Sequence, residues 1–309
     1  MNRLRVLVSN IMMINERDRF DAALREKGLE PVWPVVNQFM DEAQCLEYAG
    51  TVDGWLAGDD RITRTVLEAF LPRLKVISKW GTGIDSIDLA AARELGIPIC
   101  NSPGAFRDAV SEYAIGILLS ASRRVALTDR SIRAGKWPKG RYIGLAGGTM
   151  GIVGYGAIGQ GLGQRARGMG MTVIAHDPFL REAPDGTELV TFEALLARSD
   201  VISLCCNLTK ENYHLLDADA FAAMRDDVMI VNVARGGIID EAALTDALAS
   251  GKVSAAALDV FEQEPVPMDH PLLSFDNVVV SSHNANSTVQ AIEVVHQNTL
   301  SNLYRHLGL

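Results

Sequence analysis

Short apolar runs alternate with longer segments that have one apolar and one polar face along the first hundred residues. The runs predict strands and the amphipathic segments predict helices. We expect strands at 3–8, 52–57, 75–78 and 97–100, and helices at 17–27, 63–70 and 88–95. Strands that alternate with helices of this length are typical of parallel βαβ units. The pattern therefore predicts an α/β domain.

Asn101-Ser102-Pro103-Gly104 interrupts this alternation, and a long, mostly apolar helix is predicted after it at 107–124. The alternation then resumes. We expect strands at 149–153, 171–175, 201–205, 228–233, 254–258 and 278–280, a helix at 157–169, and a last helix at 288–306 that packs on the first domain. The fold class is therefore α/β, with two Rossmann-like or flavodoxin-like domains and parallel sheets. The predicted domains are 1–101 with 283–309, and 102–282, with the active site in the cleft between them.

Composition narrows the class of protein. Of 309 residues, 48% are hydrophobic and 22% are charged, which indicates a globular protein rather than a disordered one. The net charge of -9 offers no basic surface for nucleic acid or an anionic membrane. No apolar run reaches the roughly 18 residues that a membrane span needs. The four cysteines show no CxxC spacing, so we expect no disulfide framework, no metal site and a reducing cytoplasmic location.

The strand at 149–153 runs into a glycine motif made of Gly154, Tyr155, Gly156, Ala157, Ile158 and Gly159. Such glycines permit a tight turn, a close approach by a pyrophosphate and close packing of the following helix. Amides at the helix N-terminus favour an anion. Asp177 ends the next strand at about the spacing of a ribose-binding carboxylate, which would repel a 2′-phosphate. A lone motif of this kind is weak, but this context predicts NAD rather than NADP.

Three polar residues come just after apolar strands of the second domain, where open α/β sheets bind ligands: Arg235, Glu264 and His283. A guanidinium suits a carboxylate or an oxyanion, and an imidazole carries protons near neutral pH. Each residue also has a structural interpretation, since a single arginine is usually in a surface ion pair and a single histidine is often a turn residue. Spacing alone does not choose Glu264 over Asp259 or Glu262.

Taken together, these motifs resemble the D-isomer-specific 2-hydroxyacid dehydrogenase family. The matching segments are the glycine motif with Asp177, VNVARGGIIDE at 231–241, ALDVFEQEP at 257–265, His283, and, in the first domain, KWGTGIDSID at 79–88 and NSPG at 101–104. The likeness covers nearly the whole chain in order. The chain resembles the phosphoglycerate dehydrogenases of this family, and we expect it to lack the C-terminal regulatory domain that some of them carry.

The resemblance implies roles for these residues. Arg235 would bind the substrate carboxylate and the C2 oxygen, His283 would exchange the proton, and Glu264 would orient the imidazole and favour its charged form. The amides of Thr82 and Gly83 would bind the carboxylate. Ala234 and Asp259 would lie at the cofactor, with Asp259 near the nicotinamide carboxamide. The helix at 107–124 and its continuation at 130–144 resemble the family's dimerisation arm, which implies a homodimer.

The function expected from these observations is hydride transfer between NAD and C2 of a small D-2-hydroxy or 2-oxo acid, such as 3-phosphoglycerate, glyoxylate or hydroxypyruvate. The alternative is an NAD-sensing corepressor-like protein with little turnover. Asn207 and the turn Asn284-Ala285-Asn286-Ser287 depart from the family pattern and leave the substrate open. Lys79, beside the substrate loop, could meet an extra anionic group, although a solvated lysine at a strand end is the simpler interpretation.

Overall fold

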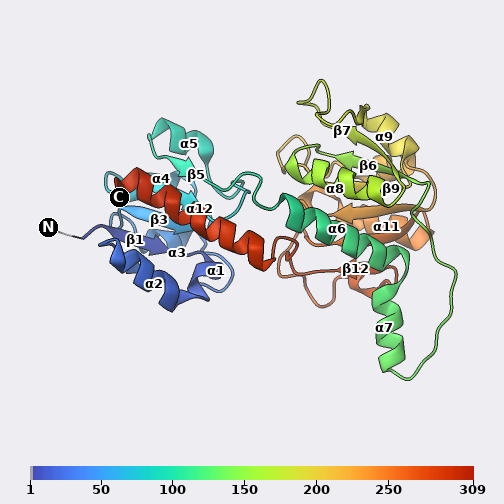
Figure 1. The fold of residues 1–309 in the computed structure, drawn as a ribbon, viewed down its shortest axis with the longest axis horizontal. Helices are drawn as coiled ribbons and strands as arrows, with labels where there is room; N and C mark the ends of the chain where they lie inside the picture. Colours follow the sequence, from blue (N-terminus) through green and yellow to red (C-terminus); the bar gives the residue numbers. More distant parts are fainter. Residues whose placement is uncertain (1–2) are drawn as a thin grey trace. The chain divides into compact units, whose positions relative to one another are not determined.

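The computed structural model describes residues 3–309; Met1 and Asn2, at the start of the predicted first domain, lie outside the described residues. The chain forms two compact units (Figure 1). One holds the residues up to Phe106 together with Thr288–Leu309, and the other is Arg107–Ser287. Both boundaries lie a few residues after the predicted ones. The ring of Phe106 packs against Trp80 of the first unit, and Asp259 of the second unit binds the amides of Asn284 and Ala285.

Five parallel strands form the sheet of the first unit in the order β2-β1-β3-β4-β5. The strands are β1 (Arg5–Val8), β2 (Glu30–Val32), β3 (Gly54–Ala57), β4 (Val76–Lys79) and β5 (Ile99–Cys100). This is the flavodoxin-like order, in which ligands bind beyond the carboxyl ends of the strands where the order reverses. The reversal lies between β1 and β3, so the segments after β1, β3 and β4 are the place to look for a site.

Six helices of the described residues belong to this unit: α1 (Ile11–Ile14), α2 (Arg17–Glu26), α3 (Glu42–Leu46), α4 (Arg64–Phe70), α5 (Leu89–Glu94) and α12 (Val289–Leu307). The C-terminal helix α12, red in Figure 1, packs on β3 and β4. Gly54 allows this contact, because a Cβ there would meet Leu303 at 2.6 Å. Trp55 and Phe70 stack in the core at 4.9 Å.

Seven parallel strands form the sheet of the second unit in the order β12-β11-β10-β9-β6-β7-β8. They are β6 (Thr149–Val153), β7 (Thr172–His176), β8 (Glu188–Leu189), β9 (Val201–Leu204), β10 (Val228–Asn232), β11 (Val253–Leu258) and β12 (Val278–Val280). The order is that of a dinucleotide-binding sheet, with its reversal between β6 and β9. The glycine motif follows β6 directly.

The helices of the second unit are α6 (Arg107–Ser122), α7 (Val125–Arg133), α8 (Ala157–Gly168), α9 (Phe192–Arg198), α10 (Ala218–Ala223) and α11 (Glu241–Ser250), with short 3-10 turns η1 (Gly236–Ile238) and η2 (Pro271–Ser274). Side chains of Thr191, Asp217 and Asp240 cap three of them by accepting backbone amides. Arg124, in the left-handed conformation with φ 54°, separates α6 from α7. In Figure 1, α7 and the loop after it extend away from the sheet of this unit.

The structure confirms the predicted fold class and the predicted strands. Two strands went unpredicted, β2 and β8, and both are short edge strands; β2 contains Pro31, which is tolerated only at such edges. The helices α1, α3, α7, α9, α10 and α11 also went unpredicted. No helix in the described part of the chain is both long enough and apolar enough to cross a membrane.

Candidate functional site

The glycine turn after β6 has the geometry of an anion-binding loop. Gly154 has φ 88° and lies against the residues that follow β9, where an added Cβ would meet the Cα of Cys206 at 2.6 Å. A Cβ at Gly159 would meet the carbonyl oxygen of Gly154 at 2.3 Å, so α8 packs directly on the turn. Gly156, the N-cap of α8, has no atom within 4 Å of an added Cβ. Open space therefore lies at the N-terminus of a helix.

Asp177, at the end of β7, is bound to this turn. Its Oδ2 accepts from the amide of Tyr155 at 2.9 Å, and its Oδ1 accepts from the amide of Phe179 at 3.0 Å. The Tyr155 side chain is buried and bonds to Asp185 and Thr187. Hydrogen bonds from Tyr155, Thr187 and Arg167 hold the pKa of Asp185 at about 2, against the opposing effect of desolvation. The turn and the loop after β7 thus form one fixed carboxylate-bearing wall.

Arg235 lies three residues after the end of β10, in an extended conformation. Asn232, which is 1% exposed, brackets the segment: its Oδ1 accepts from the amide of Ala234 at 3.0 Å, and its Nδ2 donates to the carbonyl of Arg235 at 2.9 Å. The Arg235 guanidinium donates to the carbonyl of Ala234 at 2.8 Å. The turn that presents Arg235 is therefore fixed by a buried amide side chain.

His283 and Glu264 form a direct pair. The Nδ1 of His283 lies 2.8 Å from Oε2 of Glu264, and the other carboxylate oxygen of Glu264 accepts from the amide of Phe261 at 3.1 Å. About a third of each side chain is exposed. Because an ionised carboxylate only accepts, Nδ1 carries the hydrogen and the opposite ring nitrogen, Nε2, is the one able to exchange a proton. His283 has φ 54°, an unusual conformation for a residue other than glycine.

Asp259 holds the turn that carries His283. Its side chain is 1% exposed, and its two oxygens accept from the amides of Asn284 and Ala285 at 2.9 and 3.0 Å. Its backbone carbonyl also accepts from the amide of His283 at 2.7 Å. The left-handed conformation of His283 is therefore fixed from both sides. The contact of Asp259 with a nicotinamide carboxamide stays a prediction.

The segments that carry Arg235 and Glu264 are tied to each other. The amide of Glu262 donates to the Glu241 carboxylate at 2.9 Å, and the amide of Glu241 donates to the Glu262 carboxylate at 3.1 Å. His270 bonds to the second oxygen of Glu241 at 2.9 Å. Gly236 lies so close to the other segment that a Cβ would meet the backbone of Phe261 at 1.9 Å. Since β10, β11 and β12 are neighbours in register, Arg235, Glu264 and His283 all emerge from one edge of the sheet.

Thr82 and Gly83 belong to the first unit, in the loop after β4. The carbonyl of Thr82 accepts from Asn101 Nδ2 at 2.7 Å, and the carbonyl of Gly81 accepts from the amide of Ser102 at 2.8 Å.

The interpretation of Lys79 as a solvated lysine is wrong. Its side chain is buried, and its ammonium donates to Asp59 at 2.9 Å and to the carbonyl of Trp80 at 3.0 Å.

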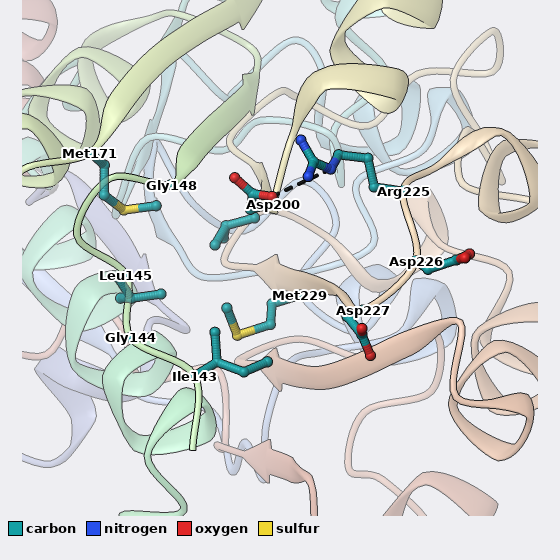
Figure 2. A pocket seen from close by; sticks show the side chains of 11 residues that line it. Ile143, Gly144, Leu145, Gly148, Met171, Asp200, Arg225, Asp226, Asp227 and Met229 are labelled. Carbon is teal, nitrogen blue, oxygen red and sulfur yellow. Dashed lines mark ion pairs between the residues drawn. The ribbon is translucent and has the colours of Figure 1, made fainter. Parts of the chain in front are cut away.

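A cavity of about 500 Å³ in the second unit lies at the other edge of the sheet (Figure 2). Its lining includes Gly148, Met171, Asp200 and Asp227, each of which precedes a strand. The cavity is therefore at the amino ends of the strands, away from the glycine turn and His283. Asp200 there is engaged by Arg225 at 3.4 Å and by the amide of Thr149 at 2.8 Å. Among residues 3–309 no cluster of His, Cys, Asp or Glu could hold a metal ion.

Several positioning residues escaped sequence reasoning: Asn232, Glu241 and the buried role of Asp259. Asn232 and Glu241 lie inside the quoted motif at 231–241, so their position was visible, but their partners were not. Glu241 meets a residue 21 positions away, and Asp259 meets residues 25 and 26 positions away. Only the folded sheet brings these pairs together.

Comparison with known proteins identifies the family. Residues 115–285 match the model of the D-isomer specific 2-hydroxyacid dehydrogenase family, NAD binding domain. The chain is 45% identical over 223 residues to a D-3-phosphoglycerate dehydrogenase of Archaeoglobus fulgidus, a match that covers 71% of this chain and 42% of that protein. It is 42% identical over 254 residues to a hydroxypyruvate reductase of Thermotoga maritima, covering 81% of this chain and 82% of that protein.

A solved structure agrees in fold over almost the full length. The TT0316 protein of Thermus thermophilus superposes with a TM-score of 0.87 at 32% identity, covering 99% of this chain and 97% of that one. By contrast, this chain spans less than half the length of several phosphoglycerate dehydrogenases that it matches.

Proposed function

This chain belongs to the D-isomer specific 2-hydroxyacid dehydrogenase family, and from that premise we propose that it interconverts a small D-2-hydroxy acid and the corresponding 2-oxo acid with NAD as cofactor. The observation that carries the proposal is the bond between His283 and Glu264, on the sheet edge from which Arg235 also emerges. A base, a partner that orients it and a cation for an oxyanion are the groups that this reaction needs.

The second unit contains the NAD-binding domain of the family. The residues present fit the cofactor, since open space at Gly156 faces the N-terminus of α8 and Asp177 offers an anchored carboxylate to a ribose. The residues that would hold NAD are Gly154, Tyr155, Gly156, Ala157, Ile158, Gly159, Asp177, Ala234 and Asp259. When bound, NAD supplies or accepts the hydride at C2 of the acid.

We assign proton exchange to the Nε2 of His283. Glu264 fixes the imidazole through Nδ1, so that Nε2 presents its proton to the C2 oxygen when a 2-oxo acid is reduced and takes it back in oxidation. A carboxylate beside the ring also favours the imidazolium that this step requires. Arg235 stabilises the negative charge that develops on the C2 oxygen and binds the substrate carboxylate.

We assign the other end of the carboxylate to the amides of Thr82 and Gly83, which makes the first unit the substrate-binding domain. The loop's place beyond the carboxyl end of β4, beside the reversal of strand order, supports this assignment.

Among acids of this class we propose those without a phosphate, such as hydroxypyruvate or glyoxylate. Lys79, the cation nearest in sequence to the substrate loop, is buried and bonds to Asp59, whose side chain is 61% exposed. The Lys79 ammonium is therefore engaged by Asp59 and by the carbonyl of Trp80 and is not presented to a phosphate group. The long match to a hydroxypyruvate reductase supports the same choice.

The test is a panel of 2-oxo acids, namely hydroxypyruvate, glyoxylate, pyruvate and 3-phosphohydroxypyruvate, with oxidation of NADH followed by its loss of absorbance. We expect hydroxypyruvate or glyoxylate to have the highest kcat/KM. Preference for the phosphorylated acid would overturn the substrate proposal. Tight NADH binding without turnover of any acid would instead favour the alternative, an NAD-sensing corepressor-like protein.

We also propose that the protein is a homodimer. Helix α7, which is described in full, buries none of its residues. Exposed apolar side chains gather on it and on the loop that follows, including Val125, Ile132, Trp137 and Ile143. Such apolar patches mark interfaces, and two-fold dimers are the commonest assembly. A monomer in light scattering would contradict this.

The four free cysteines fit a reducing cytoplasm, where we place the protein.

A further inference from the structure

His296, on α12, is buried against the substrate loop. It is 1% exposed, and its Nδ1 lies 3.1 Å from the indole Nε1 of Trp80, the residue before Gly81. The imidazole also contacts the rings of Trp80 and Phe20, with centroids 5.8 and 4.7 Å away. Trp80 is 7% exposed and packs on Phe106. A titratable ring is thus built into the support of the loop.

The indole bond fixes the protonation state of His296. An indole N–H only donates, so Nδ1 must be the unprotonated, accepting nitrogen. The neutral ring then carries its hydrogen on Nε2, which has no hydrogen-bond partner among the described residues and lies 3.7 Å from Oε1 of Glu16. An imidazolium has no acceptor nitrogen at all. Protonation of His296 must therefore break the bond to Trp80.

The neighbouring loop is held mainly through its carbonyl groups. Those of Trp80, Gly81 and Thr82 accept from Lys79 Nζ, Ser102 N and Asn101 Nδ2, at 3.0, 2.8 and 2.7 Å. Lys79, Ser102 and Asn101 come from segments next to the loop on the sheet. The indole of Trp80 extends in another direction, to α12, more than 200 residues away in sequence. This bond ties Trp80 to the C-terminal helix, which also reaches Asn101 through Asn302 at 3.2 Å.

We propose that His296 is a positioning residue whose neutral ring holds Trp80, and through it the loop Gly81–Gly83, in the form that binds the substrate carboxylate, and that protonation of the ring loosens this loop. The inference rests on the proposed function, which assigns the substrate carboxylate to this loop. Its effect should appear in the affinity for the acid and not in the hydride step, because His296 belongs to the first unit.

Charged groups around His296 set the pH at which this happens. Burial lowers its pKa, while Glu16 before α2 and Glu293 on α12 favour the charged ring. Arg19 on α2 opposes protonation and bonds to both carboxylates, at 2.9 Å to Glu16 and 2.7 Å to Glu293. Arg19→Gln should therefore move protonation of His296 to higher pH. Arg25→Gln is the matched control, since Arg25 lies on the same helix and pairs with Asp21 instead.

The first measurement is the indole N–H signal of Trp80 in nitrogen-15 NMR of the full chain, assigned with Trp80→Phe. We expect this signal to titrate in acid, to titrate at higher pH in Arg19→Gln than in Arg25→Gln, and to lose its titration in His296→Gln, whose amide oxygen accepts but does not titrate. His296→Leu should shift it at every pH. A Trp80 signal identical in wild type and His296→Leu would overturn the inference.

The second measurement is steady-state kinetics. In His296→Leu we expect KM for the acid to rise about five- to tenfold, as expected for loss of one buried hydrogen bond, with kcat and NADH affinity unchanged. His296→Gln should restore KM. A fall in kcat as large as the rise in KM, which His296→Gln does not reverse, would indicate a general structural defect. That result would overturn the positioning role of His296. If wild type turns over no acid, the proposed function fails by itself, and binding of oxamate, followed on the Gly81–Gly83 amide signals, decides the inference: equal affinity in wild type and His296→Leu would overturn it.

Discussion

The turn that carries His283 and the loop that carries Thr82 are supported in opposite ways. In the second unit, buried Asp259 holds two backbone amides, Glu264 accepts on both oxygens, and Gly236 lies directly on the neighbouring segment. In the first unit, the loop is tied to α12 by one hydrogen bond to a titratable ring. The turn of His283 is thus held by carboxylate–amide bonds that involve no titrating histidine. The substrate-binding loop has carbonyl bonds of its own, but its link to α12 depends on the protonation of His296.

The largest effect is expected at the turn that carries His283. His283→Asn removes the proton carrier, and kcat for reduction of a 2-oxo acid should fall by roughly 10² to 10⁴, as is usual for loss of a general acid. Binding of NADH, measured by fluorescence, should stay close to wild type. His306→Asn, near the end of α12, is the control and should leave kcat unchanged. Near-normal turnover by His283→Asn would show that His283 is not the proton carrier.

Gly236→Ala tests the backbone contact itself. The added methyl would meet Phe261 at 1.9 Å, so the segments of Arg235 and Glu264 must separate. We expect the free energy of unfolding to fall by about 1 to 3 kcal/mol or more, the range for overpacking, with a further loss of kcat. Gly168→Ala is the matched control, because a Cβ there meets nothing within 4 Å. Equal melting temperatures for the two variants would show that the contact can yield.

The two regions also differ in how far the sequence predicts them. The glycine turn, Asp177 and the three residues past the strands could be placed because local spacing reports strand ends and turns. The fold class followed from the same alternation. The supports could not be placed, since Asp259 binds amides 25 and 26 residues later and Trp80 meets His296 after 216 residues. Lys79 was misjudged for this reason: its burial depends on Asp59, 20 residues earlier.

A smaller effect is expected at the cofactor end of the second unit. Asp177→Asn keeps an oxygen that can accept from the amide of Tyr155 but removes the negative charge. We expect the ratio of kcat/KM for NADPH to that for NADH to rise about tenfold, equivalent to about 1.4 kcal/mol. Asp185→Asn, on the same wall but bound to Arg167, is the comparison. A wild-type enzyme that already uses NADPH as well as NADH would refute the assigned role of Asp177.

The smallest effect is expected at the link between the substrate-binding loop and α12, in the dependence of stability on pH. Burial lowers the pKa of His296 below its ordinary 6.5, so as pH falls through that value the unfolded chain takes up a proton before the folded chain does. The contribution of His296 to stability is therefore complete above about pH 6.5 and declines in acid. Denaturation midpoints of wild type and His296→Gln, compared from about pH 5 to about pH 8, isolate this contribution, because every other titrating group is common to both. The wild type should lose stability relative to His296→Gln only at the acid end. A constant difference across the range would mean that His296 does not titrate there. The bond to Trp80, and the loop that it supports, would then be insensitive to pH over this range.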